Sequence, residues 1–217
     1  MKMMKIEKLS KELDKNLNYK EIGAELKNGK IIIYPTDTVY GVGGVITNEE
    51  TIKNIYKAKD RSFSSPLIAL VSSADKIENI AVINEKNKEK IEKLIKEFWP
   101  GGLTIILESK SVVPPIMISN GKTVGVRMPA HETALKIIES AGGILPTTSA
   151  NISGEATPRS YDELDEKFKC RVDIVVDGGE CPIGTASTII DMSNENIKIL
   201  REGAISQHQI EKIIGKI

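Results

Sequence analysis

The chain has 217 residues, and its 30 basic side chains (Lys and Arg) equal its 30 acidic ones, so the formal net charge is zero. This balance excludes a strong overall positive field, and any binding of nucleic acid would therefore have to be local. The length favours one large α/β domain with a substantial core over two small domains.

Cysteine usage and hydropathy bear on the cellular compartment. The chain has only two cysteines, Cys170 and Cys181, and neither a secretory signal nor an apolar run of about 18 residues that could cross a bilayer. We therefore expect a cytoplasmic protein without a membrane partner. Residues 1–18 are expected to form a lead-in segment, with an amphipathic helix over residues 1–16, and residues 19–217 to form the main domain.

Apolar runs along the chain predict eight strands. These runs cover residues 31–34, 67–71, 103–107, 124–128, 144–148, 174–176, 187–191 and 197–200. The turn-like sequence SNEN joins the last two runs and predicts a closing hairpin. Since helical stretches separate most of the other runs, the pattern indicates an α/β fold with a mixed sheet rather than a purely parallel one.

Polar capping residues and apolar spacing predict the main helices. Asn48 is suited to cap a helix that ends near residue 58, and a long charged helix is predicted over residues 84–98, where the sequence WPGG then ends it. Two more helices are predicted over residues 131–140 and 206–214.

The sequence lacks the residues that several common catalytic and nucleotide-binding sites require. With only His131 and His208 as histidines and no Cys/His cluster, a zinc site or a cysteine nucleophile is disfavoured. The sequence SNGKT ends like a phosphate-binding loop but has Ile116 where glycine is required, and GVGGVI has Ile46 at the third glycine position of a dinucleotide fingerprint. A nucleotide would have to be bound by another architecture.

Groups that suit anions recur near the predicted strand ends. They lie in YPTDTVYG at 34–41, KDR at 59–61, VGVR at 124–127, TTSANISG at 147–154 and DGGECPIGTAST at 177–188. Each segment alone could be an ordinary turn, a solvated helix end or a Ser/Asn loop. Because ligands of α/β proteins bind at strand ends, the five together predict one anion-binding site.

Four basic residues are of particular interest. Lys59 and Arg61 follow the helix that begins at Asn48, and in an extended loop alternate residues would point to the same ligand. Arg127 lies in an apolar strand and needs a partner, either a core carboxylate or a ligand. We favour the ligand, because the neighbouring apolar strands contain no acid. Arg201 occupies a similar position after a strand, although Glu202 could be its partner.

These segments, in this order, resemble the YrdC family of threonylcarbamoyl-adenylate synthases in its short form. The resemblance extends from about Tyr19 to Gly203. It is based on YPTDTVYGVG, KDR, FWPGGLTIIL, TVGVRMP, TTSANISG, DGG followed by STIID, and LREG. It implies a twisted mixed sheet with flanking helices around a concave, positively lined cavity.

The resemblance also implies an activity. The family converts L-threonine, bicarbonate or CO2, and ATP into threonylcarbamoyl-AMP and pyrophosphate, a nucleotidyl transfer for the threonylcarbamoyladenosine modification of tRNA. Mg²⁺ is expected with ATP. The implied partners are these substrates and the downstream machinery that transfers the group to tRNA, with direct contact to tRNA or double-stranded RNA as a further possibility.

By motif position, the resemblance assigns roles to individual residues. Lys59 and Arg61 are implied as catalytic residues that contact the phosphates. The implied threonine-binding residues are Thr38, Arg127 and Ser187. The implied ATP-binding residues are Lys59, Arg61, Ser65, Thr123, Thr147, Ser149, Asn151, Thr157 and Arg201. Three positions depart from common family residues, namely Ser65 (often Asn), Leu70 (often His in longer forms) and Ala186 (often Glu). No protein side chain is implied as a metal ligand.

Two alternatives remain open. The basic cavity could belong to a YciO-like paralogue or to a module that binds double-stranded RNA or tRNA without adenylating threonine. The zero net charge and the low aromatic content (three Phe, one Trp and five Tyr) argue against an RNA-binding surface. A carbamoyl-phosphate-type transferase would share the anion-binding groups, but the chain has no motif specific to it.

Overall fold

The computed structural model describes residues 6–8 and 18–217, and in this part of the chain one mixed sheet contains eleven strands. The strands are β1 (Ile6–Lys8), β2 (Ile32–Tyr34), β3 (Gly41–Gly43), β4 (Ile68–Val71), β5 (Ala81–Val82), β6 (Leu103–Ser109), β7 (Thr123–Arg127), β8 (Ile144–Ser149), β9 (Ile174–Asp177), β10 (Thr188–Asp191) and β11 (Lys198–Arg201). All eight predicted strands are confirmed, within one or two residues at each end.

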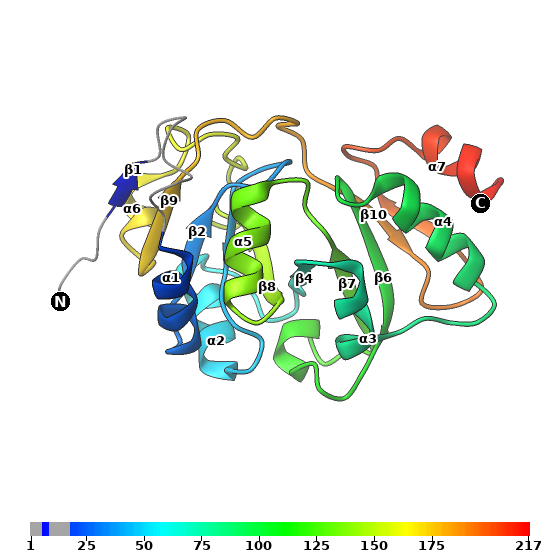
Figure 1. The fold of residues 1–217 in the computed structure, drawn as a ribbon, viewed down its shortest axis with the longest axis horizontal. Coiled ribbons are helices and arrows are strands. Elements are labelled where there is room, and N and C mark those ends of the chain that lie inside the picture. Colours follow the sequence, from blue (N-terminus) through cyan, green and yellow to red (C-terminus); the bar gives the residue numbers. More distant parts are fainter. Residues whose placement is uncertain (1–5, 9–17) are drawn as a thin grey trace.

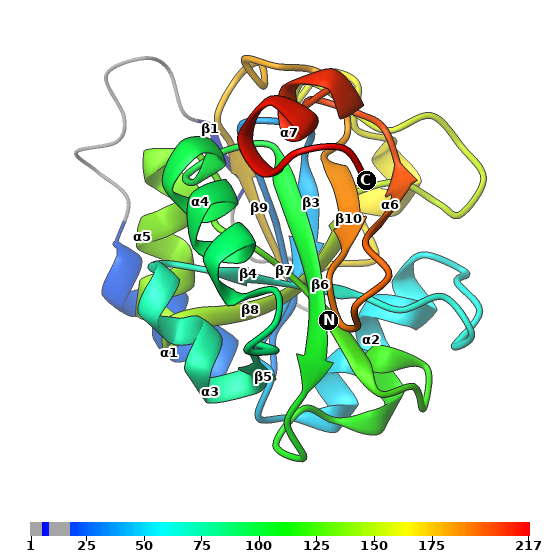
Figure 2. The same ribbon diagram turned by 90° about the vertical axis from the view of Figure 1, so that its right-hand side faces the viewer.

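The sheet interleaves segments that are distant in the sequence. Its strand order is β1-β9-β2-β3-β8-β4-β7-β6-β10-β11, with β5 paired to β6. Pairs β9–β2, β4–β7 and β6–β10 are parallel, whereas β2–β3, β3–β8, β4–β8 and β6–β7 are antiparallel. The predicted closing hairpin is the antiparallel pair β10–β11. Figure 2 shows that the sheet is strongly twisted: in this view β4 and β8 are nearly horizontal, whereas β6 and β10 are nearly vertical.

Seven α-helices and two short 3₁₀ segments lie in the described part of the chain. They are α1 (Tyr19–Lys27), α2 (Glu49–Ala58), η2 (Ala74–Lys76), α3 (Ile77–Ile80), α4 (Lys88–Phe98), η3 (Pro115–Ile118), α5 (Glu132–Ser140), α6 (Glu166–Lys169) and α7 (Gln207–Ile214). The predicted cap Asn48 is confirmed, since its side chain accepts from the amides of Glu50 and Thr51. Ser206, the first residue of the predicted last helix, forms a capping box with Gln209.

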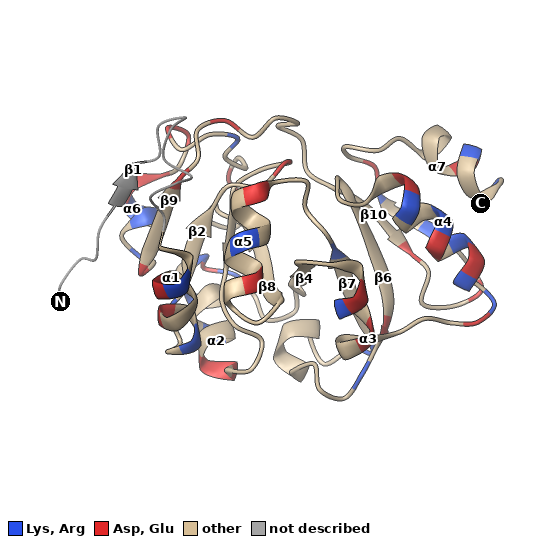
Figure 3. Cartoon of the chain, in the orientation of Figure 1, with Lys and Arg blue, Asp and Glu red and all other residues tan. Residues whose placement is uncertain are grey.

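The helices cover the sheet in separate groups. Helices α1 and α5 pack side by side in front of β2 and β8, whereas α4 and α7 pack together near β6 and β10 (Figure 1). Acidic and basic side chains are interspersed along the helices, as expected for solvated faces of a chain without net charge (Figure 3).

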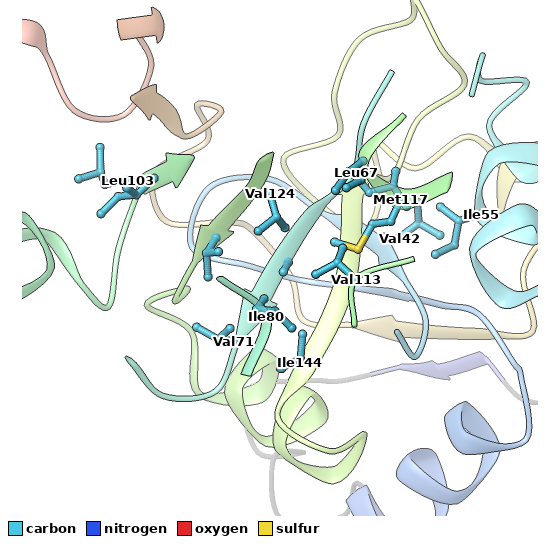
Figure 4. Close-up of a cluster of buried hydrophobic side chains, with 14 of the residues drawn as sticks. Val42, Ile55, Leu67, Val71, Ile80, Leu103, Val113, Met117, Val124 and Ile144 are labelled. Carbon is cyan, nitrogen blue, oxygen red and sulfur yellow. The ribbon is translucent and has the colours of Figure 1, made fainter. Parts of the chain in front are cut away.

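The alternation of side chains along the strands divides the core into two clusters. Ile33 of β2 and Val42 of β3 belong to the larger cluster with α2, whereas Ile32 and Tyr34 of β2 belong to the smaller cluster with α1 and α5. Figure 4 shows part of the larger cluster, in which Val42, Ile55, Leu67 and Met117 lie close together.

The prediction of a helix over residues 1–16 is wrong for residues 6–8, which form β1 and pair in parallel with β9. The rest of that prediction lies outside the described residues. In the part of the chain that the structure describes, no helix is both long enough and apolar enough to cross a membrane.

Strand β3 was not predicted, because its glycines hide the apolar pattern. Glycine is required here by close approach, since a Cβ atom on Gly43 would lie 2.8 Å from the carbonyl oxygen of Pro146 in β8. Gly41 and Gly43 pair with Ser149 and Thr147, respectively. Opposite these two hydroxyl residues β3 therefore carries no side chain, and the two strands approach closely.

Candidate active site

A cavity of about 200 Å³ lies where the predicted anion-binding segments meet. Its lining contains eight of the predicted site residues, namely Thr38, Arg61, Arg127, Thr147, Ser149, Thr157, Ser187 and Arg201. The structure therefore brings residues of the separate predicted segments together around one cavity. The remaining lining residues are Thr36, Val39, Tyr40, Gly41, Pro66, Ile68, Leu70, Thr148, Ala186 and Ile189.

The charged groups in the lining are all basic. Arg61, Arg127 and Arg201 line the cavity, and no carboxylate does. Burial lowers the pKa of each of these guanidinium groups from its ordinary value, and the neighbouring Asp37 carboxylate opposes this effect at Arg127. Guanidinium groups remain charged at neutral pH despite such shifts, so the cavity favours anionic ligands.

Arg127, at the end of β7, forms a buried ion pair that the sequence interpretation did not favour. Its Nη2 donates to Oδ1 of Asp37, its Nη1 donates to Oγ1 of Thr38 (2.8 Å), and its Nε donates to the carbonyl oxygen of Gly101 (2.9 Å). The core carboxylate, which the sequence interpretation weighed as the less favoured partner, is therefore present, and Arg127 also lines the cavity. The acid comes from the loop after β2 rather than from a neighbouring strand.

The loop between β2 and β3 is organised by Thr36. Its hydroxyl donates to the carbonyl oxygen of Val39 (2.6 Å), accepts from the amide of Thr38 (3.2 Å) and lies 3.1 Å from Thr38 Oγ1. This network holds the Thr38 hydroxyl between Thr36 and Arg127. Because its hydrogen bonds to Thr36 and Arg127 fix the orientation of the buried Thr38 hydroxyl, this group is suited to recognise a small ligand.

The Lys59–Arg61 turn has a specific backbone structure. The amide of Asp60 donates to the carbonyl oxygen of Lys57 (3.3 Å), and the amide of Arg61 donates to that of Tyr56 (3.0 Å). With Asp60 at φ 51°, these two bonds define a Schellman motif at the end of α2. The expectation of an extended loop is wrong, because the chain reverses at Asp60.

Lys59 does not line the cavity. Its side chain is buried, and Nζ donates to the carbonyl oxygens of Ser149 and Asn151 and to Oδ1 of Asn151 (3.2 Å). Burial, followed by the nearby charge of Arg61, lowers the pKa of Lys59 to about 7. Lys59 therefore links α2 to the loop after β8 from inside the protein.

Arg61 reaches the cavity while bonded to the loop that follows it. Nε donates to the carbonyl oxygen of Ser65 (3.1 Å) and Nη2 donates to that of Pro66 (3.1 Å). Ser65 thus contributes a backbone oxygen to Arg61 and does not itself line the cavity.

The loop after β8 orders its own polar groups. Ser149 Oγ donates to Oδ1 of Asn151 (2.5 Å), and Asn151 Nδ2 donates to the carbonyl oxygens of Ile152 (3.0 Å) and Glu155 (2.8 Å). Asn151 is buried behind Ser149 and does not line the cavity. Its role in this structure is to orient Ser149 and Lys59.

A third polar group lies at the start of β10. Ser187 Oγ lies 2.9 Å from Thr104 Oγ1 of β6, and Arg201 of β11 donates to the Ser187 carbonyl oxygen from Nε (3.0 Å) and Nη2 (2.9 Å). Arg201 therefore pairs with Ser187 rather than with Glu202, the partner that the sequence allowed.

The other predicted residues divide into two groups. Thr147 and Thr157 line the cavity, and the Thr147 hydroxyl donates to the carbonyl oxygen of Leu145 (2.9 Å) and lies 2.8 Å from the Tyr34 hydroxyl. Thr123 begins β7, at the opposite end of the strand from Arg127, and does not line the cavity.

Sequence reasoning missed Asp37, Thr104 and Tyr34 as partners of site residues. Asp37 stands inside the predicted PTDT segment and could have been found as the acid nearest to the site motifs. Thr104 lies within an apolar strand that carries no local signal of a site. Tyr34 begins the predicted YPTDTVYG segment, but nothing in that segment marks it as a partner of Thr147. Leu70 and Ala186, two of the departures from common family residues, line the cavity, so these departures change its surface.

Among the described residues, no group of three or more His, Cys, Asp or Glu side chains could hold a metal ion. Mg²⁺ prefers oxygen ligands and often binds through substrate phosphates. The cavity offers hydroxyl oxygens but no carboxylate, so a magnesium ion here would depend on phosphate oxygens for its negative ligands.

Comparisons with known proteins identify the family to which the chain belongs. Residues 24–203 match the family model Sua5/YciO/YrdC, described as "Telomere recombination". A threonylcarbamoyl-AMP synthase of Pyrococcus abyssi is 41% identical over 88% of this chain and 56% of its own length. A putative threonylcarbamoyl-AMP synthase of Methanocaldococcus jannaschii is 38% identical over 94% of both chains.

Solved structures show the same fold. The crystal structure of P. abyssi Sua5 complexed with L-threonine superposes with a TM-score of 0.87 at 39% identity, over 92% of this chain and 58% of that one. E. coli YciO superposes with a TM-score of 0.77 at 20% identity, over 90% of this chain and 95% of that one. The chain spans somewhat more than half the length of the P. abyssi and Bacillus subtilis relatives, 56% in each case. The chain belongs to the Sua5/YciO/YrdC family.

Proposed function

We propose that the chain is an L-threonylcarbamoyladenylate synthase, which uses L-threonine, bicarbonate or CO2, and ATP and releases pyrophosphate. The observation that carries this proposal is the cavity, in which three arginines and several hydroxyls converge with no carboxylate. The relatives support the proposal, since the P. abyssi protein at 41% identity is named threonylcarbamoyl-AMP synthase.

The chemistry suits these residues. The amine of threonine would take up CO2, and a carbamate oxygen would attack the α-phosphorus of ATP while pyrophosphate leaves. The nucleophile comes from the substrate, so the protein has to supply orientation and stabilisation of negative charge. Preorganised guanidinium and hydroxyl groups provide both, because they are already held by protein partners before the substrate arrives.

The lining residues would divide between the two substrates, with Ser187 and its neighbour Arg201 where the two sets meet. Arg127, Thr38 and Ser187 would bind threonine, with the Arg127 guanidinium facing its carboxylate. Arg61, Ser149 and Arg201 would bind the nucleotide. A cavity of about 200 Å³ is smaller than the roughly 300–1,000 Å³ typical of small-molecule sites, so part of the nucleotide would lie outside it.

Magnesium would enter with ATP and neutralise part of the triphosphate charge. The residues beside the phosphates would be Arg61 and Ser149. The product would pass to the machinery that modifies tRNA, and a direct contact with tRNA would have to be local, because the chain has no net charge.

A YciO-like function without threonine-dependent adenylation has weaker support. The likeness to E. coli YciO, at 20% identity, establishes only a common fold. An RNA-binding module is also less well supported, because Arg61, Arg127 and Arg201 line a cavity, and the basic residues on the helices are interspersed with acidic ones.

The test is the substrate dependence of pyrophosphate release from ATP. The proposal predicts release only when both L-threonine and bicarbonate are present, and release that does not depend on threonine would refute it. Arg61→Ala and Lys59→Ala should lose most of this activity while the circular dichroism spectrum stays native. Lys57→Ala serves as the control, because it removes an exposed cation from the same end of α2.

A further inference from the structure

The Schellman turn at Lys59–Arg61 has a feature that the proposed reaction does not explain. Position C′ of such a turn requires a left-handed backbone, which favours glycine, or sometimes asparagine. Here Asp60 occupies this position at φ 51°. An aspartate with a left-handed backbone is less stable than glycine unless its side chain finds a partner.

Arg171 supplies that partner from a distant part of the chain. Its Nη1 donates to Oδ2 of Asp60 (2.6 Å) and to the carbonyl oxygen of Ala58 (3.0 Å). Ala58 is the last residue of α2, so this carbonyl is one of those that a helix leaves without an intrahelical partner. One guanidinium group thus satisfies the helix end and neutralises the aspartate at the turn.

The same distant segment also contacts Lys59. Phe168 of α6 is completely buried, and Lys59 Nζ lies 5.8 Å from the centre of its ring. The backbone of Lys59 is tied as well, because its carbonyl oxygen accepts from the amide of Ser153 (2.9 Å). The segment that contains Phe168 and Arg171 therefore supports the turn without belonging to the cavity lining.

We propose that Arg171 is a positioning residue, which holds the Lys59–Asp60–Arg61 turn in the shape that binds the phosphates of ATP. Arg171 is not in the cavity lining, so it would act through Asp60 and Ala58 rather than by contact with the substrate. This inference rests on the proposed function, in which Arg61 contacts the phosphates directly and Lys59 orders the Ser149 loop.

The experiment compares Arg171→Ala, Arg171→Lys, Asp60→Gly and the double variant Arg171→Ala/Asp60→Gly with the parent protein. For each, the affinity for ATP is measured by calorimetry, and KM for ATP, KM for threonine and kcat by pyrophosphate release. Lys57→Ala is the matched control, since it removes an exposed cation from the last turn of α2 without removing a bond of the turn.

Arg171→Ala should weaken ATP binding about threefold to fivefold, the scale of one partly exposed ion pair, while KM for threonine stays unchanged. Arg171→Lys should retain part of the affinity, because an ammonium can still donate to the Ala58 carbonyl. In the double variant Asp60→Gly should restore much of the affinity, because glycine adopts the left-handed backbone without a partner.

The outcomes separate this inference from the proposed function. Unchanged ATP affinity in Arg171→Ala would overturn the inference, even if the parent protein makes the expected product. An equal rise of both KM values without rescue by Asp60→Gly would also overturn it, because it would indicate a general loss of structure. Weaker ATP binding with rescue supports the inference, even if pyrophosphate release proves independent of threonine.

Discussion

Asp37 and Arg127 form an ion pair in which both side chains are almost completely shielded from solvent, with 2% and 4% of their surface exposed. The pair joins the loop after β2 to the end of β7. Arg127 also lines the cavity, so one guanidinium group holds the site together and faces the ligand. Asp37 Oδ2 is buried without a hydrogen-bond partner, so all its stabilisation comes from Oδ1 and the charge of Arg127.

Asp37→Asn should lower the free energy of unfolding by about 3–5 kcal/mol, because it leaves the Arg127 charge buried without a counter-charge. Urea denaturation measures this loss. Glu89→Gln is the control, since it removes an exposed ion pair on α4 and should have little effect. If Asp37→Asn does not fold, Asp37→Asn/Arg127→Met should recover folding but not activity. A single variant as stable as the parent protein would show that the pair does not matter.

Lys59→Met should change how stability depends on pH. Burial lowers the pKa of Lys59 to about 7 in the folded protein, whereas the unfolded value is 10.5. Between these values the unfolded chain binds more protons, so this group makes folding more favourable as pH rises from about 7 towards 10.5. The free energy of unfolding of the parent protein minus that of Lys59→Met should therefore rise over this window.

Urea denaturation at several pH values between 6 and about 9.5 checks this prediction. Taking the difference between the two proteins removes the contribution of other titrating groups. A difference that stays constant, or that falls with pH, would contradict the assigned pKa.

Thr104→Val should raise KM for threonine about fivefold with little change in kcat, because Ser187 Oγ would lose its 2.9 Å partner and keep only Arg201. Steady-state kinetics with threonine as the varied substrate measure this effect. Thr104→Ser, which keeps the hydroxyl, is the matched control and should remain close to the parent protein. Equal KM values for the valine and serine variants would exclude an orienting role for Thr104.

Gly41→Ala should lower the free energy of unfolding by roughly 1–3 kcal/mol, because the added Cβ would lie 2.8 Å from Cγ2 of Thr147. Thr147→Ser removes that methyl group and keeps the hydroxyl. The double variant Gly41→Ala/Thr147→Ser should therefore recover much of the stability, as measured by urea denaturation. If the loss of unfolding free energy in the double variant equals the sum of the losses in the two single variants, this contact does not cause the destabilisation.

The sequence predicts most of the framework because its signals are local. Apolar runs such as residues 103–107 and 144–148 locate strands, and the caps Asn48 and Ser206 locate helix starts. Strand β3 could not be predicted in this way, because Gly41 and Gly43 give no apolar alternation. The reason for glycine at these positions is the close approach of β8, which only the folded structure shows.

The partners within the site depend on contacts between distant segments. Asp37 lies 90 residues before Arg127 in the chain, and Arg171 follows Asp60 by 111 residues, so no local pattern predicts either pair. The sequence around Lys59 is typical of a solvent-exposed helix end. Lys59 is nevertheless buried against Ser149 and Asn151, because the position of β8 in the sheet brings the loop after β8 to it. The convergence of the motifs could be predicted, with Arg61, Arg127 and Arg201 at the cavity, but the burial of Lys59 outside the lining could not.

The most direct test of the account is mass spectrometry of the product formed from ATP, L-threonine and ¹³C-labelled bicarbonate. The account predicts an AMP adduct that contains threonine and one labelled carbon, together with an equal amount of pyrophosphate. It also predicts that this adduct disappears when threonine is omitted. Pyrophosphate release without such an adduct, or an adduct that lacks the labelled carbon, would contradict the account.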